Sequence, residues 1–396
     1  MKELDRFIKY VKIDTQSDDT TGTTPSTEKQ KNLGRLLVKE LKELGLEDAF
    51  MDKFGIVYAH LKGEGETIGL NAHMDTALEI KGENVIPQII KNYDGKEILL
   101  NKDTIFSVKD FPILKNHIGH DLIVTDGTTL LGADDKAGIA IIMNVLEYLK
   151  NNPFFIHHPL SIAFTVDEEI GEGPLHFDLK KMNASYCYTI DGADINDVGY
   201  ENFNAVGVTL KIKGVTVHPG EGKDKLINAV LVFIELMNLM PKNDSPFDSE
   251  DKEGFWHIND ATGNGEEFTC NFIIRDFELQ GIQNRIDIFK NAVKTMQNKY
   301  KTAQISYEIK NQYENMNNFI NNKIAIEKAS NAIIKNGLKV THLPIRGGTD
   351  GATFTKMGMI TPNLGTGSYN HHGKFEFLDI QEFLKMINIV LDIIKY

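Results

Sequence analysis

Histidines and carboxylates gather in four short segments of this chain, at residues 71–76, 131–138, 166–171 and 369–374. Their sequences are NAHMDT, LGADDKAG, VDEEIG and YNHHGK, so each combines acids or histidines with glycine or with the end of an apolar run. Together with Asp191 they supply two imidazoles and three carboxylates as metal ligands, and one more carboxylate as a base. This set satisfies two four-coordinate zinc ions once water fills a position. Ligands without cysteine suit hydrolytic zinc, with Mn²⁺ or Co²⁺ as substitutes.

Taken one at a time, most of these segments have a simpler explanation. His73 and Asp75 could be a metal ligand and the carboxylate that orients it, or a turn with a capping aspartate. Asp134 precedes a predicted helix, where aspartate is a favoured cap, although its two oxygens could also bridge two metals. Asp191 and His372 are each typical of turns and surface loops. The metal interpretation therefore depends on the whole set.

The adjacent pair Glu168 and Glu169 is the most specific of these features. It follows the apolar run 160–166, which predicts a buried strand. A strand of this kind delivers the residues that follow it to a cleft, which makes two ordinary surface glutamates the weaker alternative. One glutamate can bind a metal while the other accepts a proton from metal-bound water.

The elements around these segments alternate between helix and strand. Apolar spacing predicts helices at 4–11, at 30–44 after a possible capping box of Thr27 and Gln30, and at 137–150, 322–336 and 379–395. Strands are predicted at 55–61, 67–72, 160–166, 185–190 and 338–342, with a strand-to-loop passage at 129–132. The candidate ligands follow the ends of buried strands, so we expect an α/β sheet with its site along one edge.

A different pattern occupies residues 206–314. It predicts strands at 206–213, 254–258, 267–277 and 304–310, with helices at 225–240 and 282–300. The order β-α-β-β-α-β is that of a ferredoxin-like α+β domain. We therefore predict a mixed-sheet α/β catalytic domain made of residues 1–205 and 315–396, interrupted by an inserted domain at 206–314.

Composition narrows the classes of partner. A formal net charge of −13 argues against nucleic acid. No apolar run approaches the ~18–20 residues of a membrane-spanning helix. The two cysteines, Cys187 and Cys270, lie in apolar strand-like sequence. We expect buried free thiols in a reducing compartment, the cytoplasm.

The order of the four segments and their amino-acid sequences resemble those of the M20 metallopeptidase family, and within it those of the aminopeptidases that act on tripeptides. The resemblance covers essentially the whole chain. It includes KIDTQS at 12–17, YENFNA at 200–205, VHPG at 217–220, IRDF at 274–277 and PIRGGTDG at 344–351. Such long stretches are highly specific. They imply a zinc-peptidase fold whose inserted domain acts as a lid and dimerisation domain.

The resemblance also implies roles for individual residues. His73 and Asp191 would hold one zinc, Glu169 and His372 the other, and Asp134 would bridge them. Glu168 would be the general base, and Asp75 would orient His73. Two departures from the family stand out. His371 occupies a position that is usually aromatic, which leaves open that His371 and His372 exchange roles. Residues 77–79 (Ala-Leu-Glu) are less polar than usual, which would alter the rim of the pocket.

Three further residues, His218 and Arg275 of the inserted domain and Arg346 beyond it, receive roles from the same resemblance. His218 would stabilise the oxyanion, although a solvent-facing turn is the plain alternative. Arg275 and Arg346 would grip the carboxylate of the peptide, since a guanidinium makes a two-point match. For Arg275, a structural ion pair with Asp276 or another acid is the competing interpretation.

The expected function is that of a dizinc aminopeptidase that releases the N-terminal residue of tripeptides through a hydroxide generated at the metals. The alternative is another M20 amidohydrolase, such as a dipeptidase, carboxypeptidase or deacylase. A metal-free binding protein would have lost a ligand or the base, and all are present. A homodimer through the inserted domain is implied by the family.

Overall fold

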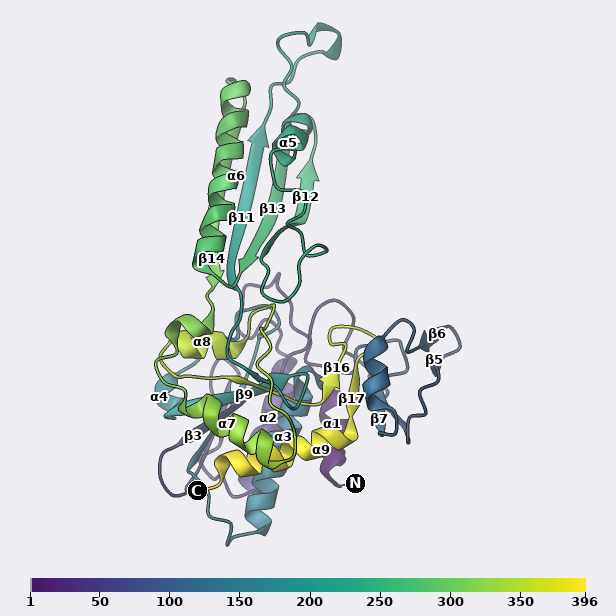
Figure 1. Cartoon of the computed structure of the whole chain (residues 1–396), viewed down its shortest axis with the longest axis vertical. Helices are drawn as coiled ribbons and strands as arrows, with labels where there is room; N and C mark the ends of the chain where they lie inside the picture. Colours follow the sequence, from purple (N-terminus) through teal and green to yellow (C-terminus); the bar gives the residue numbers. More distant parts are fainter. Residues whose placement is uncertain (1) are drawn as a thin grey trace. The chain divides into compact units, whose positions relative to one another are not determined.

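The computed structural model describes residues 2–396, which form two compact units. The first unit contains the chain up to Tyr200 together with Phe319–Leu343 and Thr349–Tyr396. The second unit contains Glu201–Asn318 and Pro344–Gly348. Figure 1 labels the helices and strands of both.

A seven-stranded sheet forms the centre of the first unit, with the order β1-β2-β8-β3-β9-β15-β10. Its four inner strands are parallel: β8 (Leu160–Thr165), β3 (Ile68–His73), β9 (Tyr186–Gly192) and β15 (Asn363–Gly365). The antiparallel outer strands are β1 (Phe50–Met51), β2 (Val57–Leu61) and β10 (Val198–Gly199). Every residue of β3 and β8 is buried, in keeping with their largely apolar or small residues. The inner strands end at the same edge of the sheet.

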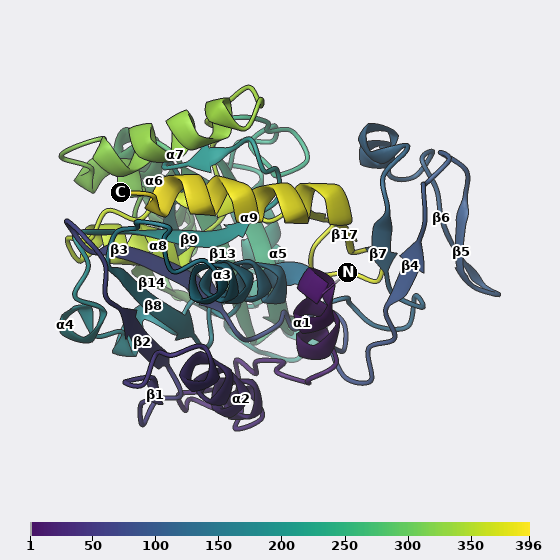
Figure 2. The same cartoon turned by 90° about the horizontal axis from the view of Figure 1, so that it is seen from below.

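Helices cover this sheet. α3 (Ala133–Asn151) packs on β3 and β9 and also contacts α1 (Lys2–Val11) and α9 (Ile380–Ile394). α7 (Ile324–Lys335) lies beside α9 (Figure 2). α2 (Gln30–Glu43) packs on β1 and β2, α4 (Leu179–Met182) on β8, and α8 (Asp350–Lys356) on β9. The mixed-sheet α/β prediction for this part of the chain is confirmed.

Smaller sheets support the loops next to the main sheet. One has the order β16-β17-β7-β4, formed by Ser368–Tyr369, Phe377–Asp379, Leu122–Val124 and Gln88–Ile90. Strands β5 (Ile98–Asn101) and β6 (Thr104–Phe106) form a hairpin. The short 3₁₀ helices are η1 (Pro112–His117), η2 (Gly173–His176), η3 (Pro219–Glu221) and η4 (Met316–Phe319). A separate aromatic core that includes Phe106, Tyr369 and Phe377 holds β16 and β17 in place.

The second unit is a four-stranded antiparallel sheet with two helices. Its elements are β11 (Asn204–Lys213), α5 (Ala229–Met237), β12 (Phe255–Gly263), β13 (Glu267–Asp276), α6 (Leu279–Lys299) and β14 (Gln304–Tyr313). The sheet order is β12-β13-β11-β14, and its core is separate from that of the first unit. The predicted order β-α-β-β-α-β is confirmed.

Three local predictions are wrong. Residues 338–342 form no strand: Thr341 makes only an isolated bridge with Asp197, whose side chain accepts hydrogen bonds from the hydroxyl of Thr341 and the N–H of Leu343, at 2.9 and 2.8 Å. Residues 129–132 form no strand, because the N–H groups at 131 and 132 donate to Glu376. Thr27 and Gln30 form no capping box: the Thr27 hydroxyl donates to the carbonyl of Gln16 at 2.7 Å, and the amide oxygen of Gln30 accepts the N–H of Asp167 at 3.2 Å.

Cys187 and Cys270 are buried free thiols, as predicted. Among residues 2–396, no helix combines the length and the apolar character needed to cross a membrane.

Candidate active site

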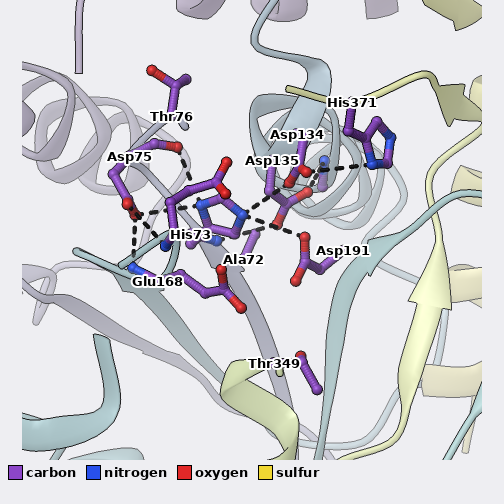
Figure 3. A network of polar contacts seen from close by, with 12 residues as sticks. Ala72, His73, Asp75, Thr76, Asp134, Asp135, Glu168, Asp191, Thr349 and His371 are labelled. Carbon is purple, nitrogen blue, oxygen red and sulfur yellow. Dashed lines mark hydrogen bonds and ion pairs between the residues drawn. The ribbon is translucent and has the colours of Figure 1, made fainter. Parts of the chain in front are cut away.

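The predicted ligands of the first unit meet at the edge where the parallel strands end. His73 is the last residue of β3, Glu168 and Glu169 follow β8, and Asp191 lies near the end of β9. Asp134 lies in the first turn of α3. Figure 3 shows one ring nitrogen of His73, Nε2, facing the carboxylates of both Asp134 and Asp191, with Glu168 beside the ring. The fold therefore brings these residues together from four elements.

The first group of ligand atoms surrounds His73. Its Nε2 lies 3.0 Å from Oδ1 of Asp134 and 3.3 Å from Oδ1 of Asp191. The other ring nitrogen, Nδ1, is 3.1 Å from the carbonyl oxygen of Asp75. A proton on Nδ1 satisfies that carbonyl and leaves the Nε2 lone pair free for a metal, with the tautomer fixed as in most histidine ligands.

The second group surrounds His372, which follows β16. Its Nε2 lies 2.9 Å from Oε2 of Glu169 and 3.4 Å from Oδ2 of Asp134. The two oxygens of Asp134 thus face two different histidines. A carboxylate in this position can bridge two metal ions.

These groups have the spacing that a metal requires. Atoms bound to one tetrahedral zinc at 2.0–2.2 Å are separated by about 3.3 Å, which is close to the separations around His73 and His372. In addition, Oε1 of Glu169 is buried without a hydrogen-bond partner among the described residues. A buried carboxylate oxygen is costly without a partner, and a cation next to Glu169 would supply one. The donor set therefore fits two metal ions.

The electrostatics of the site also favour the binding of metal ions. Burial and the charge of Asp191 raise the pKa of Glu168 well above its ordinary value. Burial and Asp134 raise the pKa of Glu169 to about 8. Burial alone would raise the pKa of Asp134, but the imidazoles of His371, His372 and His73 hold it well below its usual range. Divalent cations would compensate this concentration of buried negative charge.

Asp75 contacts His73 and also holds the glutamate pair. Its Oδ1 is 3.4 Å from Nδ1 of His73. Its two oxygens also accept the backbone N–H groups of Glu168 and Glu169, at 3.0 and 3.1 Å. This buried carboxylate therefore fixes the turn that presents the base and a ligand.

Both departures from the family pattern lie at this site. Nδ1 of His371 is 3.3 Å from Oδ2 of Asp134, and its Nε2 is 2.9 Å from the hydroxyl of Ser368. Only His372 is also paired with Glu169, which favours His372 as the ligand. Glu79 lies 3.3 Å from Nδ1 of His372, so the altered segment 77–79 contributes a carboxylate that can orient this imidazole.

Glu376 is a residue of the site that the sequence did not reveal. Its side chain is buried, and its oxygens accept the N–H groups of Leu131, Gly132 and Asp134 at 2.7, 2.8 and 3.0 Å. It therefore joins the loop that carries His372 to the loop that carries Asp134. Its only signal in the sequence is an acid four positions after the candidate ligand His372.

Two further buried aspartates support the site. The oxygens of Asp135 accept the N–H groups of His73 and Gly138, both at 3.1 Å. Asp350 accepts a hydrogen bond of 2.6 Å from the hydroxyl of Thr165, and its Oδ1 has no partner among the described residues. Burial raises the pKa of Asp350 to about 7. In the sequence, Asp135 could have been noticed as the second acid of the DDK sequence at 134–136, and Asp350 as the acid that ends GGTD at 347–350.

The remaining predicted residues belong to the second unit. His218 is exposed, and its Nδ1 accepts the N–H of Gly220 at 3.2 Å. Arg275 donates to the carbonyl of Ile274 at 3.0 Å and stacks on Tyr313. The alternative ion pair of Arg275 with Asp276 is not formed, because Asp276 pairs with Arg285.

Arg346 is anchored within the second unit. Its guanidinium donates to the carbonyl of Asp251 at 2.7 Å and the hydroxyl of Ser249 at 2.8 Å, and it stacks on Phe203. These contacts hold the segment around residue 250. Roles of His218, Arg275 and Arg346 toward a peptide stay predictions.

Comparison with known proteins defines the class. Residues 125–396 match Peptidase family M20/M25/M40. The chain belongs to this family and is a metallopeptidase.

The similar proteins with curated names are peptidases T. That of Bacillus subtilis is 45% identical over 404 aligned residues, which cover 100% of this chain and 98% of the relative. That of Caldanaerobacter subterraneus is 46% identical over 401, with the same coverage. The aminopeptidase PepT of Bacillus cereus and a tripeptidase of Staphylococcus aureus share the fold at 22% identity, with TM-scores of 0.78 and 0.80. Each comparison covers 99% of this chain and 97% of the other.

Proposed function

We propose that this protein is a zinc-dependent tripeptide aminopeptidase that holds two Zn²⁺ ions per chain. The observation that carries the proposal is the position of Asp134, whose two oxygens face the two histidine groups, with Glu168 next to them. One zinc would be held by His73 and Asp191, the other by Glu169 and His372, with Asp134 shared. The full-length similarity to peptidases T supports the substrate class.

The metal ions, when bound, supply an activated water and Lewis acidity toward the scissile carbonyl. Glu168 lies beside the ligand groups and has no metal-ligand role in this assignment. It accepts the proton of the attacking water on its carboxylate and delivers it to the nitrogen of the leaving amine. The carboxylate of Asp75 accepts the backbone N–H of Glu168 and so keeps Glu168 in place.

The second unit would complete the site. We propose that His218 donates to the oxyanion and that Arg346 and Arg275 bind the carboxylate of the peptide. We further propose that this unit serves as a lid and a dimer interface, and that the enzyme acts in the cytoplasm, where the buried thiols stay reduced.

A panel of peptides tests the function. Zinc-loaded protein is assayed on di-, tri- and tetrapeptides, each with a free and an acetylated N-terminus. We expect release of the N-terminal residue from free tripeptides and little activity on acetylated ones. Preferred hydrolysis of acetylated peptides or of dipeptides would instead assign another M20 amidohydrolase.

The metal assignment has its own test in Asp134→Ala. This variant should lose bound zinc, because both groups share that carboxylate. Full zinc content in the variant would show that Asp134 is only a helix cap.

A further inference from the structure

A second cluster of metal-ligand side chains lies in the first unit, formed by His117, His120 and Asp379. Nδ1 of His117 lies 2.7 Å and Nδ1 of His120 lies 2.5 Å from the same oxygen, Oδ2 of Asp379. The histidines come from the end of η1 and the loop after it, and the aspartate is the last residue of β17. None of these residues has a role in the candidate active site.

The cluster is held in place by its surroundings. Asp379 is fully buried, and His117 is 1% exposed. The other oxygen of Asp379, Oδ1, accepts the N–H of Glu382 at 3.0 Å and caps α9. The N–H of His120 donates to the carbonyl of His117 at 3.1 Å, which closes the turn between the histidines. The side chains therefore converge on a backbone that is already fixed, as metal sites require.

One side of the cluster is open to solvent. The His120 side chain is 37% exposed, and His120 lines a pocket of about 320 Å³ together with Asp194, Gln381 and Glu382. A pocket of this size holds several waters. Three protein ligands with access to water form the arrangement of an open tetrahedral zinc site.

Charge at the cluster also suits a cation. Burial alone would raise the pKa of Asp379, but hydrogen bonds from His117, from the N–H of Glu382 and from His120 lower it. The carboxylate therefore stays ionised near neutral pH. Since Oδ1 already serves as the helix cap, both imidazoles share Oδ2. Two ring nitrogens and one carboxylate oxygen therefore meet at a single point, where one cation could contact all three.

We propose that His117 Nδ1, His120 Nδ1 and Asp379 Oδ2 form an additional zinc site, completed by water from the adjoining pocket. Imidazole and carboxylate ligands without sulfur suit Zn²⁺ among the divalent metals. Binding requires both nitrogens to move from 2.7 and 2.5 Å to about 3.3 Å from Oδ2, the edge of a zinc tetrahedron, so both imidazole rings must shift slightly. The site would link η1, β17 and α9.

Counting zinc tests the proposal independently of any peptidase activity. The full-length protein is stripped with a chelator, reloaded with excess Zn²⁺, desalted and analysed by mass spectrometry of the metal. His120→Ala and Asp379→Asn are compared with wild type; asparagine retains the cap of α9. Each variant should hold one equivalent of zinc fewer than wild type and keep its hydrolysis of tripeptides.

A matched control is His60→Ala. His60 forms a similar pair with Asp48, at 2.6 Å, but has a single imidazole. This control should keep the wild-type zinc content. Circular dichroism confirms that each variant is folded before metal is counted.

Cobalt gives a second measurement. We compare the visible absorption spectra of the wild type and of His120→Ala, both loaded with Co²⁺. The difference between the two spectra should contain an absorption band with the intensity of one bound metal ion. Equal zinc content in wild type, His120→Ala and Asp379→Asn, with no cobalt difference band, would show that the cluster is a hydrogen-bonded network only and would overturn the proposal.

Discussion

At the scale of single residues, the site separates atoms that bind metal from atoms that hold those ligands in place. His73, Asp134 and His372 face one another through ring nitrogens and carboxylate oxygens. Asp75 and Glu376 instead accept backbone N–H groups of the ligand loops. The two kinds of residue should therefore respond differently to mutation.

Glu168→Ala removes the proposed base. We expect the variant to keep its zinc, because Glu168 binds no metal in the proposed site, and to lose at least about 100-fold in kcat, the usual contribution of a general base. Zinc content and steady-state kinetics on a tripeptide measure this. Near-normal turnover would contradict the assignment.

Glu376→Gln replaces one acceptor oxygen by an NH₂ group that faces backbone N–H donors. The loop that carries Asp134 should loosen, and zinc affinity should fall about 10- to 100-fold, as for other residues that support metal ligands. Competition with a chelating dye measures the affinity. Glu40→Gln is the control, since Glu40 binds Lys9 and Tyr10 instead. Unchanged affinity in a folded Glu376→Gln would show that the contact has no role in metal binding.

Most of the ligands that the sequence revealed share one property: His73, Glu169 and Asp191 follow a recognisable strand, and Asp134 precedes a recognisable helix. Glu376 has neighbours of an ordinary kind, Phe375 and Phe377. Its role arises only because its loop folds back onto residues 131–134, more than 240 positions earlier, with separations of 242 to 245 residues. Contacts over such distances leave no periodic signal in one sequence.

At the scale of elements, strands and helices with clear apolar patterns were predicted well. β8, β9 and α7 differ from the predictions by at most two residues at either end. The short strands β4, β7, β16 and β17 were missed, because two or three residues are too few to show alternation. The predicted strand at 338–342 failed because its pairing with the segment around Asp197 is limited to one isolated bridge at Thr341.

Asp167 joins two elements and provides a test at this scale. It follows β8, and its buried carboxylate accepts hydrogen bonds from Ser26 N–H, Ser26 Oγ and the Gln30 amide, at 2.7, 2.5 and 2.6 Å. Asp167→Ala would leave buried donors at the start of α2 unpaired. We expect a loss of about 2 kcal/mol or more in the free energy of unfolding.

Urea denaturation of Asp167→Ala against wild type measures this loss. The exposed turn residue Asp94 gives a control, and Asp94→Ala should leave the unfolding midpoint unchanged. Equal midpoints for both variants would show that the link between β8 and α2 contributes nothing to stability.

At the scale of the whole molecule, metal and stability should be coupled through pH. In metal-free protein, burial raises the pKa of Asp191 to about 6, of Asp350 to about 7 and of Glu169 to about 8. The same groups in the unfolded chain titrate at about 4. The folded protein thus holds protons that the unfolded chain has released, so stability falls as pH rises through these pKa values and levels off above them.

Urea unfolding between about pH 5 and about pH 9, with EDTA or with Zn²⁺, measures this dependence. The chelated protein should lose stability as the pH rises to about 8, the highest of these pKa values, and change little above it. The zinc-loaded protein should lose less, because the cation compensates the same charges. If the free energy of unfolding depended on pH in the same way with EDTA and with Zn²⁺, bound metal would not compensate the charge of the carboxylates.

The first unit is discontinuous in sequence, and this has a consequence for biosynthesis. His73, Asp134, Glu168 and Asp191 are all made before the second unit, whereas His372 and Glu376 follow it near the carboxyl end. A ribosome that stops early therefore releases a chain that lacks the partner of Glu169. Peptide hydrolysis should then be confined to chains whose translation has passed the last ligand, and metal loading becomes a late step in the production of each molecule.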